Sequence, residues 1–194
     1  MTYENHLSRV AERKSYLKNA LVEALQGQTK VVLEIGCGHG HWLVDFAATH
    51  PEKFCLGIDI NSGRIGRANN KRRTRNLENV RFVLGEALET LESLPAGILF
   101  TEVFVLFPDP WPKKRHWKNR LIQHSFLDEL ALKCSQAAWL YFRTDHSRYM
   151  EWATDIALEN KSWKPAIDQD WPFERETIFQ SKATDYQSLI LSKI

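Results

Sequence analysis

The chain has 194 residues, of which 43% are hydrophobic and 26% charged, and its formal net charge is +2. This length and composition favour a single globular domain over residues 1–194. No apolar stretch approaches the roughly 20 residues that cross a bilayer, and the N-terminus lacks a signal-peptide layout. Three widely spaced cysteines argue against a disulfide framework or a zinc motif, so we expect no metal site and a reducing, cytoplasmic location.

Hydrophobic periodicity predicts an N-terminal helix followed by alternating strands and helices. Strands are expected at residues 31–35, 54–58, 80–84, 98–107, 137–142, 163–167 and 186–191. Helices are expected at residues 7–26, 41–49, 62–76, 86–93, 118–134 and 146–160, with a long loop at 168–183. This alternation predicts an α/β fold with a doubly wound, mostly parallel sheet that helices cover on both faces.

A glycine-rich turn follows the first expected strand, with the sequence Glu-Ile-Gly-Cys-Gly-His-Gly at residues 34–40. Gly36, Gly38 and Gly40 allow a tight turn and let the backbone approach a ligand just before a helix begins. The third glycine lies one place too early for the dinucleotide pattern G-x-G-x-x-G. The turn therefore predicts a ligand-binding loop without specifying a dinucleotide.

Acidic residues follow the same edge of the expected sheet. Glu34 lies in the first strand, and Asp59 ends the second, about 20 residues past the glycines, where a carboxylate can hold ribose hydroxyls. Glu86 follows the third strand, although an acid that opens a helix can also simply offset the helix dipole. Acids beside a glycine turn suit an adenosine-containing ligand without phosphates, and the cation S-adenosylmethionine fits this description.

A rigid acidic turn follows the fourth expected strand. The apolar run 103–107 stops at Asp109, which lies between two prolines and is followed by Trp111 and a basic cluster. The prolines fix φ and remove amide donors, so the carboxylate lies on a stiff turn rather than within a strand. A rigid acid, an aromatic ring and cations at the carboxyl end of a strand indicate a site for a nucleotide base within a nucleic acid.

The small net charge hides two basic clusters. Residues 64–75 and 113–120 hold 11 of the 26 lysines and arginines and no acidic residue. Basic clusters on an otherwise acidic chain are expected of a protein that binds a polyanion. The alternative is a solvated helix face without a partner.

Two blocks of the sequence resemble one known family. Residues 34–40 and residues 107–116, continuing through 118–120, are similar to the bacterial-type tRNA (guanine-N7-)-methyltransferases. The first block is shared by methyltransferases generally, whereas the second is close to diagnostic. The resemblance covers the chain from about residue 31 to its end. It implies a seven-stranded Rossmann-like methyltransferase fold, and methyl transfer from S-adenosylmethionine to N7 of a guanosine in the tRNA variable loop.

The resemblance also implies roles for individual residues. Carried over by position, the residues on the S-adenosylmethionine side are Glu34, Asp59, Glu86 and Asp109. The residues that contact RNA are Lys113, Asp145 and the late motif Thr177, Ile178, Phe179 and Gln180. Gln180 stands where the family has a glutamate, so the charge is lost while an amide remains. Asp145 also precedes a helix, which leaves an N-cap as its structural alternative.

The expected chemistry needs little from the protein beyond positioning. Guanine N7 has a free lone pair and no proton, so orientation supplies most of the rate. Asp109 is the candidate catalytic residue because a fixed carboxylate stabilises positive charge that develops on the guanine ring. Trp111 or Phe107 can stack on an extruded base, and packing under the turn is the alternative for Trp111.

Two other functions remain open from the sequence. One is a different nucleic-acid methyltransferase, because Pro-Asp-Pro-Trp is reminiscent of the Pro-Pro-aromatic loops of enzymes that methylate amino groups. The other is a non-catalytic RNA-binding protein on a methyltransferase fold, which only Gln180 favours. The sequence leaves open whether the chain is a monomer or a homodimer, and it indicates tRNA as partner and no membrane.

Overall fold

The computed structural model describes residues 3–175 and 185–194. Within these residues seven strands form one sheet, in the order β3-β2-β1-β4-β5-β7-β6. The strands are β1 (Lys30–Ile35), β2 (Cys55–Asp59), β3 (Val80–Leu84), β4 (Leu99–Leu106), β5 (Cys134–Thr144), β6 (Trp163–Pro165) and β7 (Gln187–Lys193). The first five strands pair in parallel, whereas β7 pairs antiparallel with both β5 and β6. The predicted doubly wound, mostly parallel sheet is therefore confirmed.

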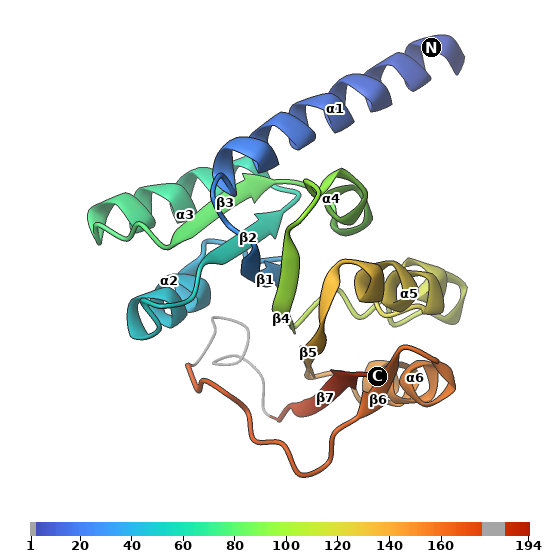
Figure 1. The fold of residues 1–194 in the computed structure, drawn as a ribbon. Helices are drawn as coiled ribbons and strands as arrows, with labels where there is room; N and C mark the ends of the chain where they lie inside the picture. The colour runs from blue at the N-terminus through green and yellow to red at the C-terminus, as the bar shows by residue number, and fades with distance from the viewer. Residues whose placement is uncertain (1–2, 176–184) are drawn as a thin grey trace.

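Helices cover both faces of the sheet (Figure 1). They are α1 (Tyr3–Ala24), α2 (His41–Thr49), α3 (Ser62–Thr74), α4 (Ala87–Ser93), α5 (His124–Leu132) and α6 (Ser147–Glu159), with a short 3₁₀ helix η1 (Lys114–Asn119). The side chains of α1, α4, α5 and α6 pack in one hydrophobic cluster and those of α2 and α3 in another. None of these helices, in residues 3–175 and 185–194, is both long and apolar enough to cross a membrane.

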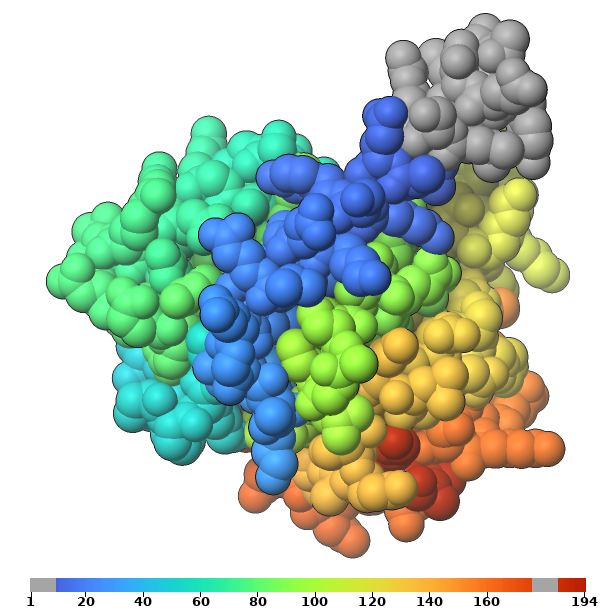
Figure 2. Space-filling view, turned by 45° about the horizontal axis from the view of Figure 1, so that its top comes forward, coloured from blue at the N-terminus to red at the C-terminus, as the bar shows by residue number. Residues whose placement is uncertain are grey.

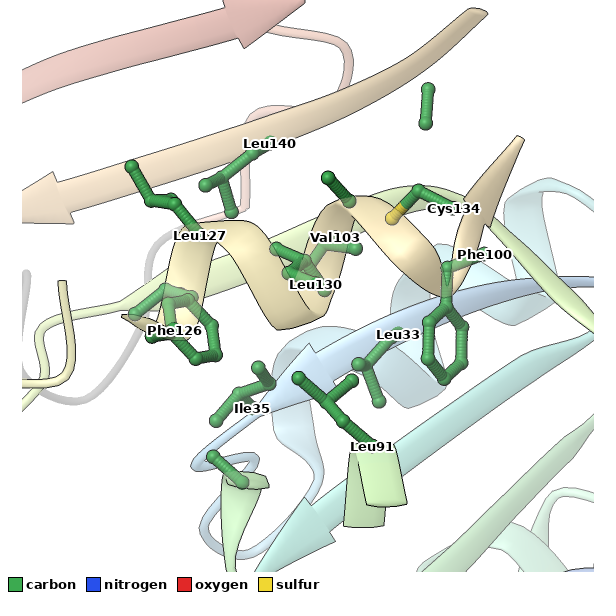
Figure 3. Packing of buried hydrophobic residues seen from close by; sticks show 14 of the residues in the cluster. Leu33, Ile35, Leu91, Phe100, Val103, Phe126, Leu127, Leu130, Cys134 and Leu140 are labelled. Carbon is green, nitrogen blue, oxygen red and sulfur yellow. The ribbon is translucent and has the colours of Figure 1, made fainter. Parts of the chain in front are cut away.

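The hydrophobic cluster that includes α1, α4, α5 and α6 forms because the strands direct apolar side chains toward these helices. Figure 3 shows Leu127 and Leu130 of α5 gathered with Leu33 of β1 and Val103 of β4. All four side chains are fully buried, and burying each one contributes about 1.5–3 kcal/mol to folding. This core holds the parallel strands side by side, which fixes where their carboxyl ends lie.

The N-terminal helix α1 is attached through α4 as well as through the core. Lys14 Nζ donates to Glu92 Oε2 over 2.6 Å, and Arg13 forms an ion pair with Glu89. Figure 2 shows α1, in blue, lying against the lime-green segment that holds α4. Helix α1 begins at Tyr3, earlier than the residue 7 that the periodicity predicted.

One predicted helix is wrong. The sequence favoured a single helix over 118–134, but the chain forms η1 over Lys114–Asn119, then an extended stretch, and then α5 over His124–Leu132. Arg120 has φ −62° and ψ 140°, which is extended backbone. Tertiary contacts stabilise this break, because the amide of Ile122 donates to Tyr149 Oη over 3.2 Å. Strand β5 begins at Cys134 rather than at 137, where Cys134 pairs with Phe100 of β4.

Candidate active site

Five acidic side chains lie along one edge of the sheet. Their strands are neighbours, in the order β3, β2, β1, β4, β5, and parallel strands bring their carboxyl ends to the same edge. In that order the acids are Glu86, Asp59, Glu34, Asp109 and Asp145. Glu34 and Asp59 are buried, whereas the other three are exposed. The edge therefore combines two buried carboxyl groups with three that are exposed to solvent.

The glycine turn between β1 and α2 has an open outer side. Gly36 and Gly38 have φ of 76° and 55°, and a Cβ built on either meets no described atom within 4 Å. Gly40 is different, because a Cβ there would lie 2.8 Å from both Ala68 and Phe82. Gly36 and Gly38 thus leave space for a ligand, while Gly40 is required for packing of α2 against α3 and β3.

Asp59 braces the glycine turn. Its Oδ2 accepts a hydrogen bond from the Gly38 amide over 3.0 Å, and its Oδ1 accepts one from the Asn61 amide over 2.8 Å. The Arg64 guanidinium lies 3.5 Å from the same carboxylate. A carboxylate has about four lone-pair sites, so these contacts leave it able to accept ligand hydroxyls.

Glu34 is the most unusual side chain at this edge. It is 3% exposed, and its Oε2 has no hydrogen-bond partner among the described residues. Burial, and then the nearby charge of Asp59, raise the pKa of Glu34 to about 8. A buried carboxyl without a partner is costly unless a cation or donor reaches it. This unpartnered oxygen fits a cationic ligand, and its burial could not be inferred from the sequence.

The structural alternative for both Glu86 and Asp145 was a role at the start of a helix, and the structure supports it for Glu86 only. Glu86 is the N-cap of α4, and its Oε2 accepts the amide of Glu89 over 3.0 Å, so the helix-start interpretation is confirmed. The N-cap of α6 is His146, and the His146 amide donates to Thr144 Oγ1 over 3.2 Å. The N-cap interpretation of Asp145 is therefore wrong, and its exposed carboxylate remains available to a substrate.

The Pro-Asp-Pro turn is held in a strained backbone conformation. Phe107 and Trp111, on either side of the turn, have φ of 50° and 45°. Such left-handed values cost non-glycine residues about 1–3 kcal/mol each and concentrate at functional sites. The Phe107 amide donates to the Arg143 carbonyl over 2.9 Å, which ties the turn to β5. The Trp111 ring is half-buried and meets the His116 ring edge-on at 5.8 Å between centroids, so packing accounts for part of its surface.

Arg143 forms an ion pair with Glu174. It is buried at the end of β5, and its Nη1 donates to Glu174 Oε2 over 3.0 Å. Its guanidinium lies 3.7 Å from the centroid of the Trp171 ring, and its Nε donates to Ser188 Oγ over 2.9 Å. These contacts attach the chain on both sides of 176–184. The predicted substrate residues Thr177, Ile178, Phe179 and Gln180 lie outside the described residues.

The first basic cluster lies beside the glycine turn. Arg67 Nη1 lies 3.3 Å from His39 Nε2, and Lys71 Nζ donates to the His39 carbonyl over 2.9 Å. Desolvation and the charge of Arg67 lower the pKa of His39 below its ordinary value. Arg75, at the far end of α3, is instead paired with Asp45. Part of the cluster is therefore exposed beside the glycine turn, and part of it is held in contacts within the protein.

The second basic cluster is divided by burial. Lys113, Lys114, Arg115 and Lys118 are exposed, but Arg120 is only 2% exposed. The expectation that this cluster binds a polyanion is therefore wrong for Arg120, which is buried. Nothing in its own sequence position separates it from its basic neighbours.

Fold comparison defines the class of protein. The 16S rRNA methyltransferase KamB superposes with a TM-score of 0.63 at 17% identity, covering 88% of this chain and 91% of that chain. TrmN from Thermus thermophilus gives a TM-score of 0.62 at 14% identity, covering 91% of this chain and 48% of that one. The fold is thus that of the Rossmann-like methyltransferases.

Sequence comparison places the chain within that class. Residues 28–193 match the Methyltransf_4 family, described as "Putative methyltransferase", and the chain belongs to this family. A tRNA (guanine-N(7)-)-methyltransferase of Magnetococcus marinus is 42% identical over 139 residues, which cover 70% of this chain and 54% of that protein. One of Nitrosococcus oceani is 40% identical over 156 residues, covering 80% of this chain and 66% of that protein. The chain spans between half and two thirds of the length of these relatives.

Proposed function

We propose that this protein transfers a methyl group from S-adenosylmethionine to N7 of a guanosine in the variable loop of tRNA. The observation that carries the proposal is that a buried carboxyl group with an unpartnered oxygen, Glu34, and the rigid turn that holds Asp109 lie at the same edge of a methyltransferase sheet. Relatives named tRNA (guanine-N(7)-)-methyltransferase support the choice of target atom and substrate. The seven-residue glycine turn supports the choice of cofactor.

The residues present fit S-adenosylmethionine. Gly36 and Gly38 leave open space at the turn, and Glu34 offers an unpartnered oxygen that a cationic cofactor would satisfy. Asp59 keeps acceptor capacity for ribose hydroxyls, and Glu86 lies exposed on the same edge beyond it. When bound, S-adenosylmethionine supplies a methyl group on a positively charged sulfur. The acidic lining suits that charge and would repel a phosphate-bearing cofactor.

Asp109 is the proposed catalytic residue. Guanine N7 attacks with its own lone pair, so the chain needs no general base. As the new N–C bond forms and the bond from the sulfur to the methyl group breaks, leaving S-adenosylhomocysteine, the positive charge would move to the guanine ring, where a carboxylate fixed on a rigid turn would stabilise it. The prolines and the left-handed residues on either side hold Asp109 in place before substrate arrives, so no reorganisation is needed at the moment of reaction.

Basic residues near the Asp109 turn and near the glycine turn are proposed to bind tRNA phosphates. Lys113 is exposed four residues after Asp109, and Lys114 and Lys118 continue the exposed cluster. Arg67 and Lys71 of α3 lie next to the glycine turn, where both contact His39. Asp145, exposed at the end of β5, is positioned to accept hydrogen bonds from the base edge. A tRNA substrate also implies a cytoplasmic location.

Mass spectrometry of nucleosides tests the proposal. Purified tRNA is incubated with the protein and S-adenosylmethionine, digested and analysed for methylated guanosine, and the modified position is mapped on the intact tRNA. The expected product is 7-methylguanosine in the variable loop. A methyl group on an exocyclic amine would support the amino-methylating alternative. Binding of tRNA without any methylation would support a non-catalytic RNA-binding protein.

A further inference from the structure

Arg120 lies inside an aromatic box behind the Pro-Asp-Pro turn. Its guanidinium carbon is 4.4 Å from the centroid of the Trp117 ring, 4.9 Å from that of Tyr149 and 5.7 Å from that of Trp152. The rings come from η1 and from α6, two elements that are far apart in sequence. Arg120 is therefore unavailable for RNA phosphates, although it belongs to a basic cluster.

Two hydrogen bonds from Arg120 connect the loops that carry Asp109 and Asp145. Nε donates to the Pro110 carbonyl over 3.0 Å, and Nη1 donates to the Arg148 carbonyl over 3.0 Å. Pro110 directly follows Asp109, and Arg148 lies in the first turn of α6, three residues after Asp145. One side chain thus holds the backbone after β4 and the backbone after β5 together.

The Pro110 contact acts on the strained part of the turn. The Pro110 carbonyl belongs to the peptide that leads into Trp111, whose φ is 45°. A fixed donor on that oxygen favours one orientation of the peptide and so opposes relaxation of Trp111. Because Pro110 directly follows Asp109, a change in this peptide would also move the backbone that carries the Asp109 carboxylate.

The arrangement is costly, which argues that it is more than packing. Desolvation lowers the pKa of Arg120 below its ordinary value, and its Nη2 is buried with no hydrogen-bond partner in the described residues. Neutral carbonyls and ring faces are its only described partners. A buried charge without a carboxylate partner does not stabilise a fold efficiently. A planar guanidinium can hold two carbonyls in different directions, which the single ammonium of lysine cannot do in the same way.

We propose that Arg120 is a positioning residue for methyl transfer: it fixes the Asp109 turn relative to the Asp145 loop. The proposal rests on the proposed function of Asp109. In this role Arg120 touches neither the cofactor nor the RNA, and it acts on the rate only through the orientation of Asp109.

The test is a set of Arg120 variants assayed by single-turnover methyl transfer at saturating tRNA and S-adenosylmethionine. Arg120→Lys should lower the rate by about 10- to 100-fold, the scale expected for a small misplacement of a catalytic group. Binding of S-adenosylhomocysteine and of tRNA, including its salt dependence, should change less than about twofold if the phosphate contacts are intact. Arg120→Gln, which keeps a donor without burying a charge, should show the same separation of rate from binding.

Arg81→Lys is the matched control. Arg81 also donates to two backbone carbonyls, those of Glu78 and Val80, and lies 5.7 Å from the Phe54 ring, but it is near the start of β3, away from the acidic edge. It should keep the wild-type rate. If replacing an arginine simply loosened the packing of the protein, a smaller fraction of molecules would bind S-adenosylhomocysteine. That loss would appear in the Arg120 variants and in the Arg81 control alike.

A double variant gives the decisive comparison. If Arg120 acts through Asp109, Asp109→Asn with Arg120→Lys should be no slower than Asp109→Asn alone, because effects within one unit are not additive. Additive losses, a wild-type rate in Arg120→Lys, or a reduced salt slope would overturn the proposal. A wild-type protein that methylates no RNA would instead refute the proposed function. Hydrogen exchange at the amides of Phe107, Asp109 and Trp111 would still test whether Arg120 fixes the Asp109 turn. Unchanged protection of these amides in Arg120→Lys would contradict the proposal.

Discussion

The backbone amide of Gly38 and the carboxylate of Asp59 are joined by a 3.0 Å hydrogen bond between the glycine turn after β1 and the end of β2. Asp59 also accepts the Asn61 amide at the start of α3. One buried side chain therefore shapes the glycine turn. The binding role proposed for Asp59 has to be separated from this structural role by experiment.

Removing Asp59 should weaken cofactor binding more than it weakens the fold. Asp59→Ala should reduce S-adenosylhomocysteine affinity by about 1.5–3 kcal/mol, the usual range for charge-assisted hydrogen bonds. Isothermal titration calorimetry measures the affinity, and thermal unfolding reports any loss of the turn. Asp155→Ala, at an exposed position on α6, is the control. Cofactor affinity equal to that of the wild type would exclude Asp59 from the binding site.

Glu34 should make stability fall with rising pH. The unfolded carboxyl titrates near 4.5 and the folded one near 8, so between these values the folded state keeps a proton that the unfolded state releases. A raised pKa of an acid thus removes stability as pH rises, and the loss is complete above about pH 8. Glu34→Gln should unfold at a higher temperature than the wild type at pH 8.5, with a smaller difference at pH 5.

The same substitution should weaken cofactor binding. Deprotonated Glu34 attracts a cation, so wild-type affinity for S-adenosylmethionine should rise as pH passes about 8, and that rise should be absent in Glu34→Gln. Calorimetry in buffers of different ionisation enthalpy also counts the proton released on binding. An identical pH dependence in both proteins would show that Glu34 does not face the ligand.

Asp109→Asn should separate chemistry from affinity. It keeps the size of the side chain and removes its charge, so methyl transfer should slow by about a hundredfold or more, as when an electrostatic stabiliser is lost. Affinity for tRNA should stay the same or rise slightly, because one repelling charge is gone. Single-turnover rates at saturating tRNA measure the effect, with Asp155→Asn as the control. A wild-type rate would mean that the proposed site is in the wrong place.

Basic residues of α3 should differ in their effect on RNA binding. Arg67→Gln, beside the glycine turn, should weaken tRNA binding and reduce the salt slope by about one unit or less, as expected for one lost phosphate contact. Arg75→Gln should leave the slope unchanged, because Arg75 is already paired with Asp45. Binding measured across salt concentrations distinguishes the two. Equal effects of both substitutions would indicate a diffuse charge effect rather than a defined contact.

Regular elements were predictable where local pattern and tertiary structure agree. The helix at 41–49 and the strand at 80–84 lie where the sequence placed them. The helix expected at 118–134 failed because apolar residues at helical spacing did not reveal that Tyr149 and Arg120 would hold the chain extended at 120–123.

The positions of the acids along the sheet were predictable, but their environments were not. Strand ends and spacing indicated Glu34, Asp59 and Asp109 from the sequence. Burial of Glu34 depends on residues distant in sequence, and the buried position of Arg120 depends on contacts with α6. Local sequence carries neither fact, because both arise from packing between elements.

The antiparallel strand β7, which lies between β5 and β6, has a consequence for folding during synthesis. Residues 163–165 of β6 can pair only after residues 187–193 of β7 have left the ribosome. Until then one side of β5 stays unpaired, while the parallel strands β1 to β4 and the glycine turn are already complete. An emerging chain would therefore assemble strands β1 to β4 first and expose an open edge of β5, the strand that holds Arg143, until residues 187–193 arrive. A pause in translation over this interval would prolong the period in which that edge can pair with another nascent chain.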